Sequence, residues 1–355
     1  MTGHEGNGRR TAAVRMGAGG ARVLSLDILR GLSILLMLLV NNLAEAPQTV
    51  SQLRHAEWGS GIHLADLAFP WFLLCVGVAI PFSAAGFARR GESKRQFYLR
   101  ILRRTAILLA LGAILDMSWD HKLVFFTVGV LQTIAISYAL AALLYNLAGR
   151  WRLLVAGVCL VGYWAAIKLL PIPGVGAGVF TEDRNLILYL NRTYLGHVGL
   201  WNLPRIVPTT ALTLIGTAVG DLLRREYTDP RRKSAALALL GVVFVAGGYI
   251  WSLSLPFNKP VWTPSYVLLA AGLGTLLLGL VYLVVDIWRW RWWAFPLIVF
   301  GSNAVLAYVV PILVKTLILN PLDVSIVQWF RLTSFVVFWW LVLWLLHRKK
   351  IFLRV

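Results

Sequence analysis

Three histidines stand in long polar segments between apolar runs, where an imidazole could act as a general base. His55 and His63 lie in one such segment (residues 45–63), and His197 lies in another (171–206). Imidazole titrates near neutral pH, so it can take a proton from an amine or a hydroxyl. Many loop histidines are only solvated, so the residue type alone leaves both interpretations open.

Polar residues inside apolar runs are a second group of candidates, because burying them in lipid costs free energy. Asp27 and Arg30 are three residues apart and would share a helix face, where they can form an ion pair. Asp66 begins an apolar run, where a helix N-terminus would stabilise its charge. Asn41 could simply cap the end of the first run, and Asn303 could belong to a small-residue packing face.

Familiar catalytic motifs are missing from the sequence. It contains no P-loop, no GxSxG nucleophile elbow and no HExxH zinc motif. Cys75 and Cys159 both lie inside apolar runs, so they indicate neither a disulfide framework nor a metal site. Spacing alone therefore predicts a polar outward-facing cavity without a metal.

Membrane-spanning helices must position these residues. Of the 355 residues, 59% are hydrophobic and 14% are charged, whereas a soluble domain has about a quarter charged residues. The apolar runs are long enough to cross about 30 Å of hydrocarbon as helices, and they alternate too rarely for a β-barrel. We predict an all-α integral membrane protein, a polytopic bundle of about ten transmembrane helices. The predicted spans are 24–44, 64–87, 101–120, 123–146, 152–170, 207–223, 235–255, 265–285, 294–317 and 333–347.

Basic residues predict the orientation of this bundle. With alternate loops on opposite sides, 24 of the 34 Lys and Arg residues fall on the side of residues 1–22, and 8 fall on the other. This bias predicts that both termini are cytoplasmic, in a multi-pass protein of the cell inner membrane. Residues 1–22 are expected to be a disordered cytoplasmic tail. The net charge of +19 is then a topology signal, and we expect no nucleic-acid partner.

The end of the first run contains a sequence that resembles a signal-peptide cleavage site, Ala44-Glu45-Ala46. We expect the first apolar run to stay in the mature protein, because a signal peptide that is removed would not need the polar residues of this run. Trp58 lies near a predicted span end, as interfacial aromatic anchors do.

Four motifs follow one another in an order that resembles a known family. They are SLDILRG (25–31), VNN (40–42), HAEW (55–58) and LADLAFPWF (64–72). This pattern is similar to that of heparan-α-glucosaminide N-acetyltransferase and its bacterial relatives, the transmembrane acyltransferases. Weaker matches are LPIPG (170–174), GVLQ (129–132), PSY (264–266), GSN (301–303) and RKKIF (348–352).

The resemblance implies that residues 23–355 form a transmembrane acyltransferase domain. Such an enzyme would move an acetyl group from cytosolic acetyl-CoA to an amine or hydroxyl of an extracytoplasmic saccharide-type acceptor. His55 would be the general base or transient acetyl carrier, with Asn41 at the reaction centre. The implied cofactor-binding residues are Arg22, Asp27, Arg30 and Gln132. The implied acceptor-binding residues are Trp58, Asp66, His197 and Asn303.

The chain departs from the family pattern in three places. The interval from His55 to Asp66 is one residue longer, and Thr133 stands where the pattern has Arg in GVLQR. The segment WNLPR (201–205) stands where the pattern often has DPEG. Loss of these acids would alter recognition of a cationic amino sugar, so we expect a bacterial-type envelope saccharide or another acceptor in place of heparan.

A transporter or flippase is the alternative to an enzyme. Such proteins usually contain inverted repeats and ionisable residues near the membrane midplane, and neither is evident here. The sequence leaves N- or O-acetylation and the oligomeric state open, and a homo-oligomer is among the alternatives.

Overall fold

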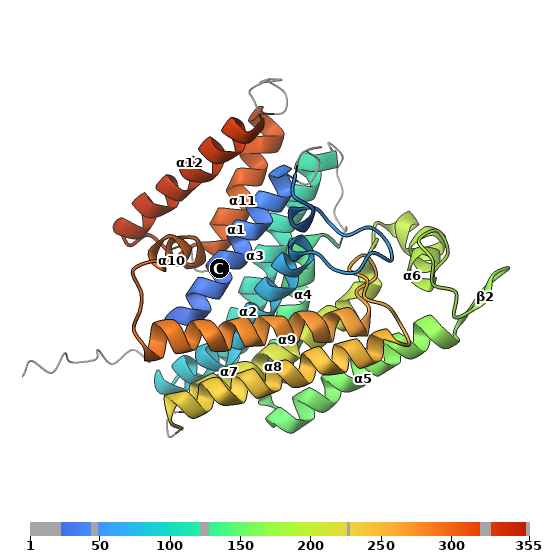
Figure 1. Ribbon diagram of the computed structural model, residues 1–355, viewed down its shortest axis with the longest axis horizontal. Coiled ribbons are helices and arrows are strands. Elements are labelled where there is room, and N and C mark those ends of the chain that lie inside the picture. The colour runs from blue at the N-terminus through green and yellow to red at the C-terminus, as the bar shows by residue number, and fades with distance from the viewer. Residues whose placement is uncertain (1–22, 44–48, 121–127, 226–227, 320–327, 353–355) are drawn as a thin grey trace, which may run out of the picture.

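The computed structural model describes residues 23–43, 49–120, 128–225, 228–319 and 328–352 (Figure 1). Arg22, the rest of the predicted tail and Glu45-Ala46 lie outside the described residues. Within those ranges the chain is mainly helical and has almost no strand, which confirms the predicted all-α class. The strands are a two-residue antiparallel pair, β1 (Pro171–Ile172) with β2 (Gly176–Ala177), in which Pro171 is opposite Ala177.

A helix occupies each segment that the sequence predicts to span the membrane. These helices are α1 (Leu24–Leu43), α2 (Leu64–Arg89), α3 (Lys94–Asp120), α4 (Val130–Leu143), α5 (Gly149–Leu169), α7 (Ile206–Arg224), α8 (Pro230–Ser252), α9 (Pro264–Val281), α10 (Phe295–Ser302) with α11 (Ala304–Val314), and α12 (Gln328–Arg348). The short helix α6 (Leu186–Leu190) lies in the long connection between α5 and α7.

Six of the described helices are long and apolar enough to cross a membrane. The pair α10 and α11 would count as a seventh, although it bends by 79° at Asn303. Helix α4 is a shorter apolar helix, and α3 begins with a strongly basic stretch. The chain is therefore a multi-pass membrane protein by these helices, and the number ten stays a prediction.

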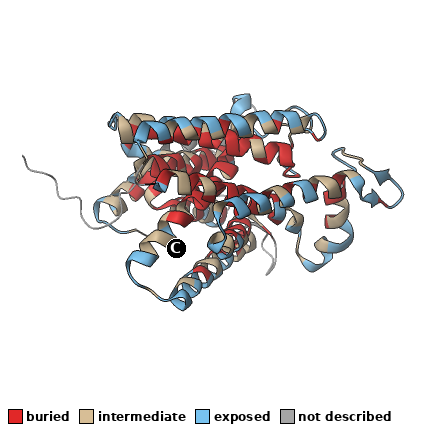
Figure 2. Ribbon diagram, turned by 90° about the horizontal axis from the view of Figure 1, so that it is seen from below, coloured by how far each residue is buried: buried red, intermediate tan, exposed pale blue. Residues whose placement is uncertain are grey.

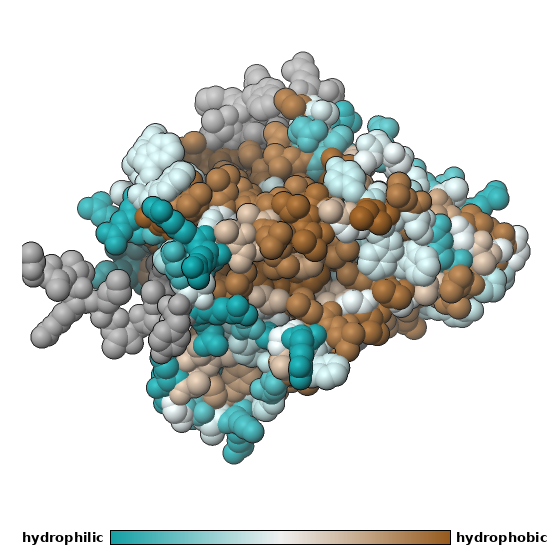
Figure 3. Space-filling view, turned by 60° about the horizontal axis from the view of Figure 1, so that its bottom comes forward, coloured by the Kyte–Doolittle hydropathy of each residue, from teal (hydrophilic) through white to brown (hydrophobic). Residues whose placement is uncertain are grey.

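Helices α2 and α7 form the centre of the bundle. About 72% of the apolar window of α2 and 78% of that of α7 is buried, against 28% for α5 and 22% for α8. Figure 2 shows the same division between buried inner helices and an exposed periphery. The outer helices present apolar side chains such as Val158 and Ile250 outward, and Figure 3 shows a broad hydrophobic face on this side. A face of this kind suits contact with lipid tails.

Glycines allow α1 and α10 to approach closely. A Cβ atom on Gly31 would lie 1.9 Å from the backbone oxygen of Leu297, and one on Gly301 would lie 2.0 Å from that of Asp27. Both contacts are with backbone, so no side chain can rotate away. Small residues at such crossings let membrane helices pack backbone to backbone.

We expect Gly31→Ala to lower the apparent melting temperature of the purified protein by several degrees. The added methyl group must push α1 away from α10, and overpacking of this kind costs roughly 1–3 kcal/mol. Gly157→Ala on α5 is the matched control, because its Cβ would meet nothing within 4 Å. A melting temperature unchanged by Gly31→Ala would contradict the close crossing.

Candidate active site

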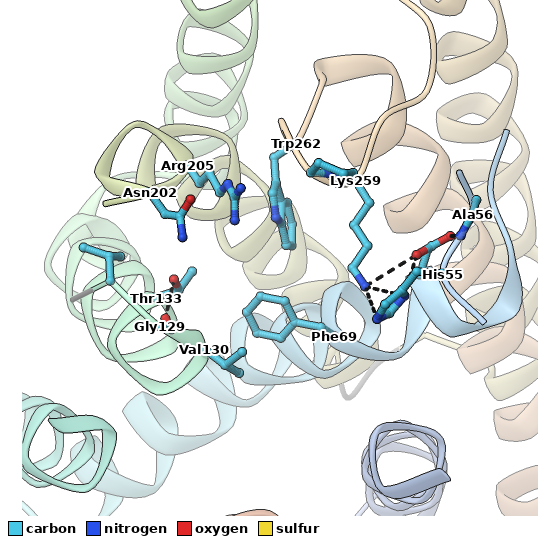
Figure 4. A pocket seen from close by; sticks show the side chains of 13 residues that line it. His55, Ala56, Phe69, Gly129, Val130, Thr133, Asn202, Arg205, Lys259 and Trp262 are labelled. Atoms are coloured by element: carbon cyan, nitrogen blue, oxygen red, sulfur yellow. Dashed lines mark hydrogen bonds and ion pairs between the residues drawn. The ribbon is translucent and has the colours of Figure 1, made fainter. Parts of the chain in front are cut away.

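A cavity of about 310 Å³ lies where the first turns of α2, α4 and α7 meet the loop before α9 (Figure 4). In the predicted alternation these four helices all start on the extracytoplasmic side. Helix α2 packs against α7 and α9, and α4 packs against α7. The ends of these four helices that are predicted to face the extracytoplasmic side therefore surround one cavity.

His55 and Asp66 form a hydrogen-bonded pair at the edge of this cavity. The Nδ1 atom of His55 lies 2.9 Å from Oδ1 of Asp66. The Asp66 side chain is 2% exposed and that of His55 is 48% exposed. The carboxylate thus anchors the ring from within the protein, while the ring itself remains accessible from the cavity.

The position of Asp66 on α2 explains how one carboxylate organises the loop. Asp66 lies in the first turn of the helix, and its Oδ2 accepts hydrogen bonds from the backbone N–H groups of His63 (3.0 Å) and Ala56 (3.2 Å). These bonds fold residues 56–63 back onto the helix start. They also leave Oδ1 directed at His55, so the loop and the imidazole are fixed together.

An acid partner on Nδ1 determines what the imidazole can do. A carboxylate acceptor favours the tautomer with its proton on Nδ1, which makes Nε2 the nitrogen that can accept a proton. The His55–Asp66 pair is therefore arranged as an oriented general base or nucleophile. The sequence predicted His55 for this role but assigned Asp66 to acceptor binding. In the structure the Asp66 carboxylate contacts His55 and the loop, and Asp66 also lines the cavity, so acceptor binding by Asp66 stays a prediction.

Lys259 completes this cluster from the loop between α8 and α9. Its Nζ lies 2.9 Å from Nδ1 and 3.2 Å from Nε2 of His55, and 3.4 Å from Oδ1 of Asp66. Burial lowers the pKa of the Lys259 ammonium below its ordinary value of 10.5, and the Asp66 carboxylate opposes this shift. A cation is thus held beside the reactive nitrogen of the imidazole.

The loop that carries Lys259 is built around Asn258 and Thr263. The backbone N–H of Asn258 donates to Oγ1 of Thr263 (3.0 Å), and Oδ1 of Asn258 accepts from the backbone N–H of Val261 (2.8 Å). Trp262 adopts a left-handed φ of 60° between them. A non-glycine residue in this region costs free energy, and here the strained turn places the Trp262 ring in the cavity wall.

Aromatic side chains separate the two ends of the cavity. Phe69 and Trp262 meet edge to face with ring centroids 5.4 Å apart, and Trp262 meets Tyr266 at 5.5 Å. The Tyr266 hydroxyl donates to the backbone oxygen of Asp66 at 2.6 Å, which joins the start of α9 to the start of α2. Aromatic faces of this kind suit stacking against the apolar face of a sugar ring.

Asn202 and Arg205 form the wall opposite His55 and Lys259 (Figure 4). They immediately precede α7, and Asn202 has a left-handed φ of 73°. The backbone N–H of Asn202 donates to Oδ1 of Asn191 at 3.0 Å, which ties this turn to the long outer connection. The cavity therefore has a His–Asp–Lys end and an Asn–Arg end.

Two other predicted site residues lie beside this cavity. Gln132 follows Gly129 on α4 and donates to Oδ2 of Asp116 at 2.7 Å, one layer below the lining residues. Trp58 packs on Phe180 with ring centroids 5.1 Å apart and lines a smaller adjoining cavity with Asp66. Both positions are compatible with support of the site.

The remaining described candidates lie outside the cavity lining. Asn41 is exposed, and its backbone oxygen accepts from Nζ of Lys315 at 2.8 Å. His197 is exposed on the outer connection.

Three predicted residues meet near the α10–α11 break. Asp27 and Arg30 form an ion pair at 2.6 Å, and Nε of Arg30 donates to the backbone oxygen of Gly301 at 2.7 Å. Asn303 is buried there and donates to the backbone oxygen of Ile351 at 3.0 Å. Asn303 is thus held against the C-terminal segment at a helix break, outside the lining of the cavity at His55, and its binding of the acceptor stays a prediction.

Sequence reasoning missed the functional positions of Lys259, Arg205 and Trp262. In the sequence, Lys259 and Arg205 served only as two of the basic residues counted to predict the orientation. Lys259 also lies 204 residues from His55 in the chain. The one available signal was the weak PSY match (264–266), which directly follows the Lys259 loop.

Comparison with known proteins agrees with the geometry. Residues 22–256 match the family described as heparan-alpha-glucosaminide N-acetyltransferase, catalytic. The human protein of that name is 26% identical over 371 residues, covering 84% of this chain and 54% of its own length. The mouse protein of that name is 24% identical over 355 residues, covering 81% and 53%. The chain spans about half the length of these relatives, and it belongs to the family of the heparan-alpha-glucosaminide N-acetyltransferase catalytic domain.

Proposed function

We propose that this protein transfers an acetyl group from cytosolic acetyl-CoA to an amine or hydroxyl of a saccharide on the extracytoplasmic side. The observation that carries this proposal is the buried Asp66 carboxylate that orients His55 at an accessible cavity. Membership of an N-acetyltransferase family supports the reaction class. The predicted topology supports the direction of transfer, because it places this cavity outside and most basic residues inside.

The reaction assigns one role to each member of the cluster. The amine nitrogen or hydroxyl oxygen of the acceptor attacks the thioester carbonyl, and Nε2 of His55 takes the proton that this atom loses. The C–S bond then breaks, and the proton passes to the departing CoA thiolate. If His55 is instead a transient carrier, its Nε2 attacks the thioester first, the C–S bond breaks and CoA leaves as the thiolate. The acceptor then attacks the acetyl-imidazole, the C–N bond to His55 breaks, and the acceptor proton passes to the released imidazole nitrogen. Asp66 holds the ring in position for either course.

Lys259 would stabilise the negative charge that develops on the carbonyl oxygen. Its Nζ lies 3.2 Å from Nε2 of His55, beside the nitrogen where the reaction occurs. A fixed cation in a partly desolvated site stabilises such an oxyanion more strongly than water does. This role requires the charged form of the lysine.

The acetyl donor would approach from the interior of the bundle. A narrow and mainly apolar cavity lies between α1, α2, α3, α4 and α11, with Arg104 on its wall. It shares Val130 with the outer cavity. Basic clusters at the inner face could hold CoA phosphates by charge-assisted hydrogen bonds. This cavity has a volume of only about 20 Å³, so a donor that reaches His55 from the cytoplasmic side would require these helices to move apart.

The pH dependence of transfer tests the role of Lys259. Burial lowers the pKa of Lys259 from 10.5. As the pH rises, the lysine therefore loses its charge before pH 10.5 is reached, and activity should fall with it. Lys259→Arg keeps a positive charge to higher pH, and we expect the alkaline limb of the pH–rate profile to move upward. Lys259→Met should lower kcat at every pH where Lys259 of the unmodified protein is charged, and the two proteins should converge above the alkaline limb. An alkaline limb that is unchanged in Lys259→Arg would contradict this role.

Incubation of the purified protein with radiolabelled acetyl-CoA and a panel of envelope saccharides tests the proposed function. We expect label on at least one saccharide and release of free CoA thiol in equal amount. Absence of acetyl-CoA binding would overturn the proposal and favour the transporter or flippase alternative. Analysis of the labelled product by mass spectrometry would also distinguish an acetamide from an acetate ester.

A further inference from the structure

The wall of the cavity opposite His55 contains polar atoms that lack partners. Nε of Arg205 and Oδ1 of Asn202 are both buried and make no hydrogen bond. Within the described part of the chain, no carboxylate forms an ion pair with Arg205. Arg205 as a whole is half-buried and lines the cavity, so its guanidinium can be reached from there. A cation that faces a cavity without a carboxylate partner is suited to a ligand that supplies one.

The other charges of the cavity do not neutralise Arg205. The Asp66 carboxylate is already engaged by His55, by Lys259 and by two backbone N–H groups. Lys259 adds a second positive charge at the far end. Among the described lining residues, the cavity thus contains more positive than negative side-chain charge, and none of the lining residues at the Arg205 end is acidic.

We propose that Arg205 and Asn202 form a subsite for an anionic group, a carboxylate or a phosphate, carried by the saccharide acceptor. A guanidinium binds either group through two parallel hydrogen bonds, and the Asn202 amide can bond an adjacent sugar hydroxyl. The sugar ring would lie against Phe69 and Trp262, with its reacting amine or hydroxyl toward His55. This proposal rests on the proposed function, because it assumes that a saccharide acceptor binds in this cavity.

The position of the subsite favours the acceptor over the donor as the source of the anion. Arg205 and Asn202 lie at the extracytoplasmic ends of their elements in the predicted topology, whereas the donor phosphates would remain near the inner face.

Two matched pairs of saccharides test this subsite on the full-length protein in detergent. One pair is glucuronosyl-glucosamine and glucosyl-glucosamine, and the other is glucosamine 6-phosphate and glucosamine. Calorimetric titration gives their affinities without any turnover, and the acetyl-transfer assay gives their kcat/KM ratios. We expect the acidic member of at least one pair to bind more tightly, and this preference to weaken as salt is added.

Substitution of Arg205 should change the preference and not only the overall activity. We expect Arg205→Ala to reduce the acidic-over-neutral ratio by roughly 10- to 100-fold, and Arg205→Lys to retain part of it, because lysine lacks the planar fork. Arg205→Glu should favour glucosamine over its 6-phosphate. Arg192→Ala is the matched control, because Arg192 is an exposed arginine of the same outer connection outside the cavity lining.

The outcomes separate this subsite from the proposed function. Equal binding of acidic and neutral saccharides by the unmodified protein, or a preference unchanged in Arg205→Ala, would overturn the subsite even if acetyl transfer is observed. Weaker acetyl-CoA binding in Arg205→Ala with an unchanged saccharide preference would assign the anion to the donor and also overturn it. An Arg205-dependent preference without acetyl transfer would support the subsite and refute the acetyltransferase.

Discussion

Replacing His55 with alanine is expected to abolish measurable acetyl transfer while the protein remains folded. A general base contributes typically 10²- to 10⁴-fold to the rate, and a nucleophilic carrier contributes the whole covalent route. The His55 side chain is 48% exposed, so its removal leaves no large internal cavity. The rate of labelled acetyl transfer and the melting temperature should be measured on the same preparation.

His197→Ala is the matched control for that experiment. His197 is an exposed histidine of the outer connection and does not line the cavity. Its substitution should therefore leave transfer close to the unmodified rate. Transfer by His55→Ala at the unmodified rate would refute the assignment of His55. Rapid denaturation at neutral pH during turnover, followed by mass spectrometry, would show whether labelled acetyl is bound to His55, which distinguishes a carrier from a base.

Asp66→Asn is expected to have the second largest effect, with transfer reduced by roughly 10²- to 10⁴-fold. The amide keeps the size of the side chain but cannot accept two backbone N–H bonds and an imidazole N–H in the same way. The His55 ring would lose both its orientation and the negative charge that stabilises its protonated form. Loss of bonds to a buried acceptor should also cost about 1–3 kcal/mol of stability.

Glu57→Gln provides the comparison for Asp66→Asn. Glu57 is an exposed acid of the same loop, two residues from His55. Its neutralisation removes the same charge from the same face without touching the His55–Asp66 hydrogen bond. Equal losses of kcat in the two variants would indicate a general electrostatic effect, and would contradict a specific role for Asp66 in orienting His55.

Hydropathy predicted the positions of the helices because lipid imposes a simple length requirement on them. The predicted span 207–223 differs from α7 (Ile206–Arg224) by one residue at each end. Helix α3 begins at Lys94, seven residues before the predicted span, because its basic first turns continue the helix beyond the apolar part. The break at Asn303 was not predicted, because apolar content carries no information about helix direction.

The site was only partly predictable for a different reason. His55 and Asp66 are eleven residues apart, so a short motif contains both of them. The other lining residues come from two connections that are distant in the chain. Asn202 and Arg205 precede α7, and Lys259 and Trp262 precede α9. No local pattern in a single sequence reports such contacts, since they depend on how α2, α4, α7 and α9 pack. The cation-rich character of the cavity became visible only after these segments were brought together.

Transfer across a sealed membrane tests the central claim most directly. The protein should be reconstituted in one orientation in liposomes, with radiolabelled acetyl-CoA supplied to the side of the termini and the saccharide acceptor confined to the other side. We predict labelled saccharide in the compartment that never contained acetyl-CoA, and no label when His55 is replaced with alanine. Label that appears only when donor and acceptor share one compartment would contradict the account.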